Sequence, residues 1–318
     1  MTIFGHELWI WVAFNALIIV LLVVDLRVFH RRAHEVRVRE ALAWSAVWIV
    51  LSLAFNLFVY FWMGSAAALQ FLTGYLIEKS LSVDNLFVFL LIFSYFKVPA
   101  RYQHRVLYYG ILGALIMRGT LIALGVTLIH QFQWILDVFG LFLIYAGARM
   151  AFQRQQTVID PDRNIGVKVV RRLFRLSRGY HEGKFFVRED GKSMATLLFL
   201  VLVMVETTDL VFALDSIPAI FAITTDPFLV YTSNIFAILG LRALYFALKG
   251  LMDLFHYLKL GLSLILILIG MKMLIADMFP IPTWVSLVAV AGILTVSVVA
   301  SLLAPRRSSE SDGSKPSI

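Results

Sequence analysis

The chain has 318 residues, of which 60% are hydrophobic and only 15% are charged, and its mean hydropathy is +0.85. An ordinary globular domain carries about 25% charged residues, so the composition excludes a soluble protein and predicts an all-α integral membrane protein. The net charge of +8 requires no nucleic acid, because loop charges that set membrane topology and face anionic lipid explain it. The absence of cysteine excludes disulfides, iron–sulfur clusters and thiolate metal sites.

About nine transmembrane helices are expected, because a helix needs about 20 mostly apolar residues to cross a bilayer. Charged and proline-containing breaks divide the chain into spans at 6–29, 41–64, 67–95, 105–129, 132–152, 194–223, 229–252, 257–277 and 283–304. We expect the first span to be retained rather than cleaved as a signal peptide, because it is too long and ends in a basic cluster.

Lysine and arginine fall in alternate loops of this predicted topology. Of the 28 basic residues, 23 follow the first, third, fifth, seventh or ninth span, and the loops between hold none. Basic residues accumulate in loops that remain cytoplasmic, so the N-terminus is expected outside and the C-terminus in the cytoplasm. Residues 153–193 are expected to form a cytoplasmic connector, and the tail 305–318 is expected to be disordered.

Three consecutive spans occur twice in the chain. The third and sixth spans match at three positions, which pair Glu78 with Asp209, Asp84 with Asp215, and Asn85 with Ser216. The fourth and seventh spans share Ile-Leu-Gly followed by an arginine, which is Arg118 in one and Arg242 in the other. The fifth and eighth spans share a further pattern at 143–150 and 266–273.

The charge pattern gives the two copies opposite orientations. The first copy, 67–152, starts outside, whereas the second, 194–277, starts inside, so the chain is expected to contain two inverted three-helix repeats. Transporters of this design hold their substrate near the midplane, at the interface between the repeats. The two spans within 1–66 and the ninth span within 278–304 are expected to surround this core.

Five carboxylates lie inside two of the apolar spans, at Glu78, Asp84, Glu206, Asp209 and Asp215. An acid at the centre of a membrane helix costs about 2.5 to 3.5 kcal/mol even on the mildest insertion scale, so we expect these residues to form the functional site. Glu206 and Asp209 share a helix face, whereas residues six apart diverge by about 120°. Glu78 and Asp84, and likewise Asp209 and Asp215, can therefore meet at one ligand only if their helix bends between them, and Pro218 is expected to loosen the second helix.

The polar groups of these spans suit a hard divalent cation. Manganese, magnesium and calcium prefer oxygen ligands, whereas zinc or copper would usually recruit imidazole or thiolate. The expected metal ligands are Glu78, Asp84, Asn85, Glu206, Asp209, Asp215 and Ser216. The cations expected to balance the five acids are Lys79, Arg118 and Arg242, which leaves a net charge of −2 for a divalent ion to neutralise.

A structural alternative stays open for the arginines. Arg118 and Arg242 would then form buried ion pairs with two of the acids and only hold helices together. Asp25, near the end of the first span, is expected to pair locally with Arg27.

The motifs Glu78-Lys-Ser-Leu-Ser-Val-Asp-Asn85, Glu206-Thr-Thr-Asp209, Asp215-Ser-Ile-Pro218 and Asn234-Ile-Phe-Ala-Ile-Leu-Gly-Leu-Arg242 together resemble the TerC/Alx family of bacterial membrane proteins. The resemblance covers all nine spans and carries the acidic motif of the family onto the five carboxylates. It implies an inner-membrane protein with manganese(II) as the substrate ion. The family is associated by name with tellurium resistance, and its Alx-like members with manganese export and a response to alkaline pH.

Two functions remain open at this point. The favoured one is export of divalent manganese through alternating exposure of an acidic midplane site, coupled to proton influx and without a tightly bound cofactor. The alternative is a metal-binding membrane module that loads manganese onto secreted proteins, or confers tellurium resistance, with a partner in the secretion machinery. An enzyme is not expected, because the sequence contains neither the Gly-x-Gly-Asp context of membrane aspartyl proteases nor a phosphate-binding loop.

Overall fold

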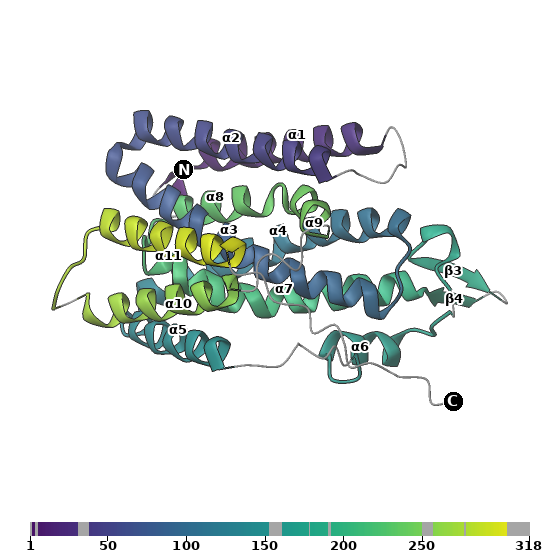
Figure 1. The fold of residues 1–318 in the computed structure, drawn as a ribbon. Coiled ribbons are helices and arrows are strands. Elements are labelled where there is room, and N and C mark those ends of the chain that lie inside the picture. Colours follow the sequence, from purple (N-terminus) through teal and green to yellow (C-terminus); the bar gives the residue numbers. More distant parts are fainter. Residues whose placement is uncertain are drawn as a thin grey trace.

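Long apolar helices make up most of the chain (Figure 1). The structure, a computed structural model, describes residues 2–3, 6–30, 38–152, 161–177, 179–189, 192–249, 257–276 and 278–303. Its long helices are α1 (Leu8–His30), α2 (Val38–Met63), α3 (Ser65–Tyr95), α4 (Ala100–Gln131), α5 (Ile135–Phe152), α7 (Leu197–Phe221), α8 (Pro227–Ile238), α9 (Leu241–Lys249), α10 (Leu258–Ile275) and α11 (Thr283–Leu303). The predicted all-α integral membrane architecture is therefore confirmed.

Seven of the described helices are long and apolar enough to cross a membrane, or eight if α8 and α9, which bend by 40° at a short break, form one span. The remaining expected span is α3, whose apolar run is interrupted by Glu78, Lys79 and Asp84. Helices stand at all nine expected positions, but length and composition support only seven or eight as spans. The count of nine stays a prediction.

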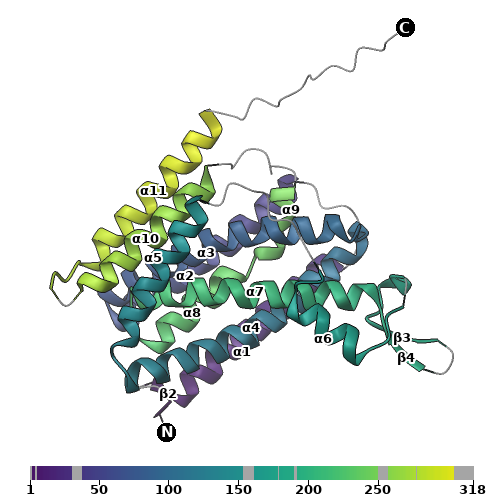
Figure 2. The ribbon, with the colours of Figure 1, turned by 90° about the horizontal axis from the view of Figure 1, so that it is seen from below.

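The peripheral helices expose apolar side chains as a lipid environment requires. On α1 and α2, large residues such as Val12, Val50 and Phe61 are more than half exposed. In water such surfaces would associate, whereas in a bilayer they face acyl chains at no cost. Figures 1 and 2 place α1 and α2 on one side of the bundle and α5 and α10 on the other, with α3, α4, α7 and α8 between them.

The central helices pack in pairs drawn from the two predicted repeats. Helix α3 packs on α8 and α7, α4 packs on α7, and α5 packs on α10. The α5–α10 contact is reciprocal: a Cβ atom on Gly147 would lie 2.7 Å from the Ser263 carbonyl oxygen, and one on Gly270 would lie 2.6 Å from that of Gly140. A two-fold axis produces such reciprocity, so the contact supports the inverted repeat, which stays a prediction.

The break in the core lies at a different place from the one expected. Helices α3 and α7 run without interruption past their acidic residues, and Pro218 lies inside α7 near its end. The chain breaks instead between α8 and α9, where Gly240 has a φ of +83°. Glycine adopts this left-handed conformation without steric cost, and a Cβ there would lie 2.7 Å from the Trp48 ring of α2. The expectation that Pro218 loosens the acidic helix is therefore wrong.

The connector between the repeats contains folded elements. Within 153–193 lie α6 (Ile165–Leu173), a 3₁₀ turn (His181–Gly183) and most of an antiparallel hairpin of β3 (Phe186–Glu189) and β4 (Lys192–Ala195). A second short hairpin, β1 (Thr2–Ile3) with β2 (His6–Glu7), precedes α1.

The connector is fixed to the bundle by polar and aromatic contacts. The Tyr180 hydroxyl donates to the Phe96 carbonyl at the end of α3, and Arg105 of α4 lies 5.5 Å from the Phe185 ring centre. Burial raises the pKa of Tyr180 above its ordinary value, which keeps the donating hydroxyl protonated. The tail expected to be disordered, 305–318, lies outside the described residues.

Candidate functional site

Arg118 of α4 is the centre of the polar core. Its side chain is completely buried and contacts α3, α7 and α8. Its Nη1 donates to Glu78 and, at 3.2 Å, to Asn234 Oδ1, while Nε and Nη2 donate to the two carboxylate oxygens of Asp209 at 3.3 and 3.2 Å. We call Arg118, Glu78, Asp209 and Asn234 the arginine cluster.

The arginine cluster lies deep in the bundle. The outer ends of the helices are expected at Ser65 of α3, Gln131 of α4 and Phe221 of α7. Glu78 and Arg118 lie equally many residues from the outer ends of their helices, and Asp209 lies one residue closer to its own. At a rise of 1.5 Å per residue, these distances are all about 18 to 20 Å. With a hydrocarbon core about 30 Å thick, the three charged groups belong to the apolar interior of the membrane.

The arginine cluster joins two acids that the repeat alignment matches. Glu78 comes from the first predicted repeat and Asp209 from the second, yet both bind one guanidinium. A buried charge is tolerated when it is paired and hydrogen-bonded, and the forked contact of Arg118 with Asp209 is the strongest geometry for such a pair. Arg118 therefore forms the buried ion pairs of the structural alternative, and a purely structural role for them stays a prediction.

Glu206 lies one turn before Asp209 and close enough for the two carboxylates to repel each other. It faces the glycines of α4, because a Cβ atom on Gly113 would lie 2.2 Å from Glu206 Oε1. Its Oε2 is buried without a hydrogen-bond partner among the described residues. Gly113 therefore provides the space for this third acid, which Arg118 does not bind.

Asp84 and Asp215 do not join the arginine cluster. Asp84 is attracted by Lys259 at the start of α10, and Asp215 by Arg149 near the end of α5. Each lies six residues from an acid of the arginine cluster on the same unbroken helix. Residues six apart on a helix point in directions that differ by about 120°, so these aspartates point away from the cluster. Across the part of the chain that the structure describes, no three His, Asp or Glu side chains are grouped closely enough to hold a metal ion.

The two neighbours of these aspartates are buried in the bundle. Asn85 is 5% exposed and Ser216 is 1% exposed, and Ser216 Oγ has no hydrogen-bond partner among the described residues. The ligand roles predicted for Asn85, Ser216 and the five acids stay predictions.

Two of the three predicted charge-balancing cations bind elsewhere. Arg242 pairs with Asp25 of α1 at 2.7 Å and also donates to the Asp25 carbonyl oxygen at 3.0 Å. Lys79 donates to the carbonyl oxygens of Ala237 and Leu239, at 3.2 and 3.4 Å. Asp25 therefore has Arg242 as a partner, and its expected pairing with Arg27 stays a prediction, because the side chain of Arg27 lies outside the described ones.

Sequence reasoning missed two polar contacts of the acidic helices. Asn234 binds both Arg118 and Glu78, the latter through Nδ2 to Oε2 at 3.4 Å. Asn164, which caps α6, bonds the Thr207 hydroxyl at 2.8 Å beside Glu206. Asn234 opens the motif that ends at Arg242, which was a usable signal, whereas nothing in the local sequence of Asn164 indicated its contact.

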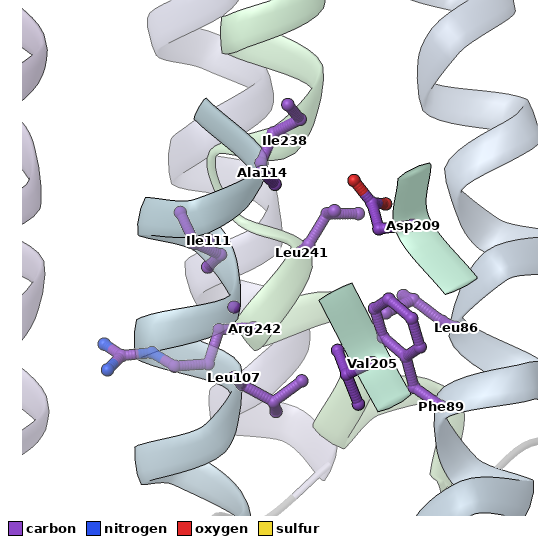
Figure 3. Close-up of a pocket in the computed structure, with 11 residues that line it drawn as sticks. Leu86, Phe89, Leu107, Ile111, Ala114, Val205, Asp209, Ile238, Leu241 and Arg242 are labelled. Carbon is purple, nitrogen blue, oxygen red and sulfur yellow. The ribbon is translucent and has the colours of Figure 1, made fainter. Parts of the chain in front are cut away.

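A small cavity lies beside Asp209, at the break between α8 and α9 (Figure 3). Its volume is about 20 Å³, enough for roughly one water molecule. The Asp209 carboxylate points toward the side of the cavity where Ile238 and Leu241 flank the break, and the guanidinium of Arg242 points away. The cavity thus connects the arginine cluster with the broken helix.

Comparisons with known proteins agree on one family. The sequence profile of the integral membrane protein TerC family matches residues 63–309. An uncharacterized membrane protein of Myxococcus xanthus is 48% identical over 309 residues, or 97% of each chain. An Escherichia coli K12 protein, provisionally named membrane-bound redox modulator Alx, is 49% identical over 299 residues, covering 91% of this chain and 93% of its own. No solved structure matches the chain.

Proposed function

The chain belongs to the TerC family of integral membrane proteins, and from this premise we propose that it exports divalent manganese from the cytoplasm in exchange for protons. The observation that carries the proposal is the arginine cluster, where repeat-matched acids from two helices share one buried guanidinium. Inverted-repeat transporters hold their substrates at such an interface. The proposal is transport rather than catalysis, in the bacterial inner membrane.

The charge of the core suits exchange of one cation for another. When ionised, Glu78, Asp209 and Glu206 carry three negative charges against the single positive charge of Arg118. The net charge of −2 is that of a site for one divalent cation, and carboxylates are ligands that manganese accepts. In this scheme the guanidinium of Arg118 binds Glu78 and Asp209 while the substrate is absent, and the metal ion displaces the guanidinium when it binds.

Export of a divalent cation needs an energy source. Moving two charges outward against an inside-negative potential costs about 4.6 kcal/mol per 100 mV, at about 2.3 kcal/mol per charge. Carboxylates release protons when they bind a cation, so inward proton flow can drive the metal outward. Glu206, which has no arginine partner, is the acid best placed to exchange protons.

The alternative function, loading of metal onto secreted proteins through a partner, also has a supporting observation. Helix α6 exposes a stripe of apolar residues, with Ile165 at 76% and Leu173 at 69%, next to basic residues of the same helix. A docking surface of this kind is what the loading function requires. The redox role in the name of the Escherichia coli relative would not use thiols of this chain, which has no cysteine.

Manganese flux into proteoliposomes tests the proposal, with a pH gradient imposed in each direction. We expect saturable flux that follows the gradient and is lost in Glu78→Gln and Asp209→Asn. Asp137→Asn, which alters an exposed acid at the start of α5, is the matched control and should transport normally. Retained binding without flux in any sample would favour the loading function, and flux indifferent to the gradient would exclude proton coupling.

A further inference from the structure

Lys79 bridges the arginine cluster and the broken helix. It follows Glu78 directly on α3, and its Nζ donates to the carbonyl oxygens of Ala237 and Leu239 on the other side of the helix interface. Two consecutive residues of α3 therefore contact different parts of the bundle: Glu78 binds Arg118, and Lys79 binds carbonyl oxygens at the break between α8 and α9.

The carbonyl oxygens bound by Lys79 are available as acceptors because α8 ends inside the bundle. The last carbonyl groups of a helix have no partner within it, and an unsatisfied carbonyl in the membrane interior costs several kcal/mol. Gly240, with its positive φ, turns the chain so that α9 starts in a new direction. A lysine ammonium satisfies these oxygens and also complements the negative end of the α8 dipole.

Helix α8 receives a second connection from α3 one turn earlier. Asn234 donates to Glu78 and accepts from Arg118, so the state of the arginine cluster acts on α8 close to the break. The far side of the break is held separately, because Trp48 packs on Gly240 and Asp25 pairs with Arg242. Movement of α3 against α8 would therefore concentrate at the carbonyl groups that Lys79 binds.

We propose that Lys79 is a positioning residue that couples cation binding at the arginine cluster to bending at the α8–α9 break. The inference rests on the proposed function. When a cation takes Glu78 from Arg118, α3 moves relative to α8, Lys79 leaves the carbonyl oxygens of Ala237 and Leu239, and the break changes shape. The cavity between Asp209 and Leu241 then opens or closes with occupancy of the site.

Thiol labelling provides a direct test, because the natural chain has no cysteine. Leu241→Cys places one thiol on the cavity at the break, in a side chain that is buried in this state. Its labelling rate is measured in membrane vesicles with and without manganese chloride. We expect manganese to change the rate by about tenfold, which corresponds to a shift of about 1.4 kcal/mol in the conformational equilibrium.

Variants at position 79 separate coupling from a purely structural role. Lys79→Met should keep manganese binding, measured directly on the purified protein, but lose the effect of manganese on labelling, whereas Lys79→Arg should retain it. Lys272→Met, which alters a buried lysine of α10 away from the break, is the matched control and should respond like the parent. If the methionine variant does not assemble, Lys79→Gln provides the same comparison.

The outcomes distinguish this inference from the proposed function. A labelling response in Lys79→Met as large as in the parent would overturn the role of Lys79. A parent protein that binds manganese without any change in labelling would overturn the coupling and leave the binding site intact. A parent protein that binds no manganese would contradict the proposed function itself, and the coupling with it.

Discussion

The two arginines that follow the shared Ile-Leu-Gly motif have different partners. Arg118 of α4 binds Glu78 and Asp209 in the centre of the bundle, whereas Arg242 of α9 binds Asp25 of α1, outside the predicted repeats. Glu78 and Asp209 thus occupy matching positions in the two predicted repeats and share one partner, whereas Arg118 and Arg242 have unrelated partners. In the predicted repeats, the two matched acids therefore meet at one arginine, whereas the other arginine attaches a peripheral helix to the bundle.

The largest effect in this comparison is expected from Arg118→Met. The change leaves Glu78 and Asp209 buried without a cation, and such an uncompensated charge costs about 3 to 5 kcal/mol. Thermal unfolding of the purified protein in detergent measures the loss. Adding Glu78→Gln and Asp209→Asn to the same chain should restore part of it, and an Arg118→Met protein as stable as the parent would contradict the buried ion pairs.

Arg242→Met should have a smaller effect, nearer the lower end of the same range of about 3 to 5 kcal/mol, because it leaves one carboxylate, that of Asp25, rather than two without a charged partner. A double-mutant cycle with Asp25→Asn measures the coupling between the two side chains. Manganese flux in the proteins that assemble should be unchanged. Loss of flux with normal assembly would show that this pair belongs to the transport site, and the distinction between the arginines would fail.

The glycines of the shared Ile-Leu-Gly motif, Gly113 and Gly240, also have different surroundings. Gly240→Ala forces a left-handed backbone onto alanine and places a Cβ 2.7 Å from Trp48, so we expect a loss of about 1 to 3 kcal/mol. Gly292→Ala is the control, because its Cβ would meet nothing within 4 Å. Equal unfolding temperatures for the two variants would argue against the break at Gly240.

The smallest effect on stability is expected from Gly113→Ala. Its Cβ would lie 2.2 Å from Glu206 Oε1, at the flexible end of that side chain, while alanine favours the helix by about 1 kcal/mol over glycine. The cost of displacing the Glu206 side chain and the gain in helix propensity roughly cancel in the free energy of unfolding, but the Glu206 carboxylate has to move. Manganese affinity should therefore fall with little change in unfolding temperature, and an unaltered affinity would exclude Glu206 from the site.

The sequence predicted the helices well because apolar length is a local property. The expected spans 41–64 and 283–304, for example, end within three residues of α2 and α11. The break was misplaced because the conformation of Gly240 depends on the approach of Trp48, from a distant helix, while Pro218 near the end of α7 is tolerated. A proline is visible in the sequence, but a tertiary contact is not.

The candidate site was predicted in part for a similar reason. Alignment of the repeats matched Glu78 with Asp209, and the structure brings both to Arg118. Convergence of Asp84 with Glu78, and of Asp215 with Asp209, required bent helices, and both helices are continuous. The partners of Lys79 and Arg242 could not be predicted, because these contacts join segments more than 150 residues apart.

Equilibrium binding of manganese to the purified protein, followed by the loss of the spectrum of free Mn²⁺ in electron paramagnetic resonance, tests whether the arginine cluster binds the cation. Parent protein, Asp209→Asn and Asp25→Asn are compared at equal concentration. The arginine cluster as cation site predicts saturable binding by the parent and by Asp25→Asn, and loss of binding in Asp209→Asn. Equal binding by all three proteins would contradict it.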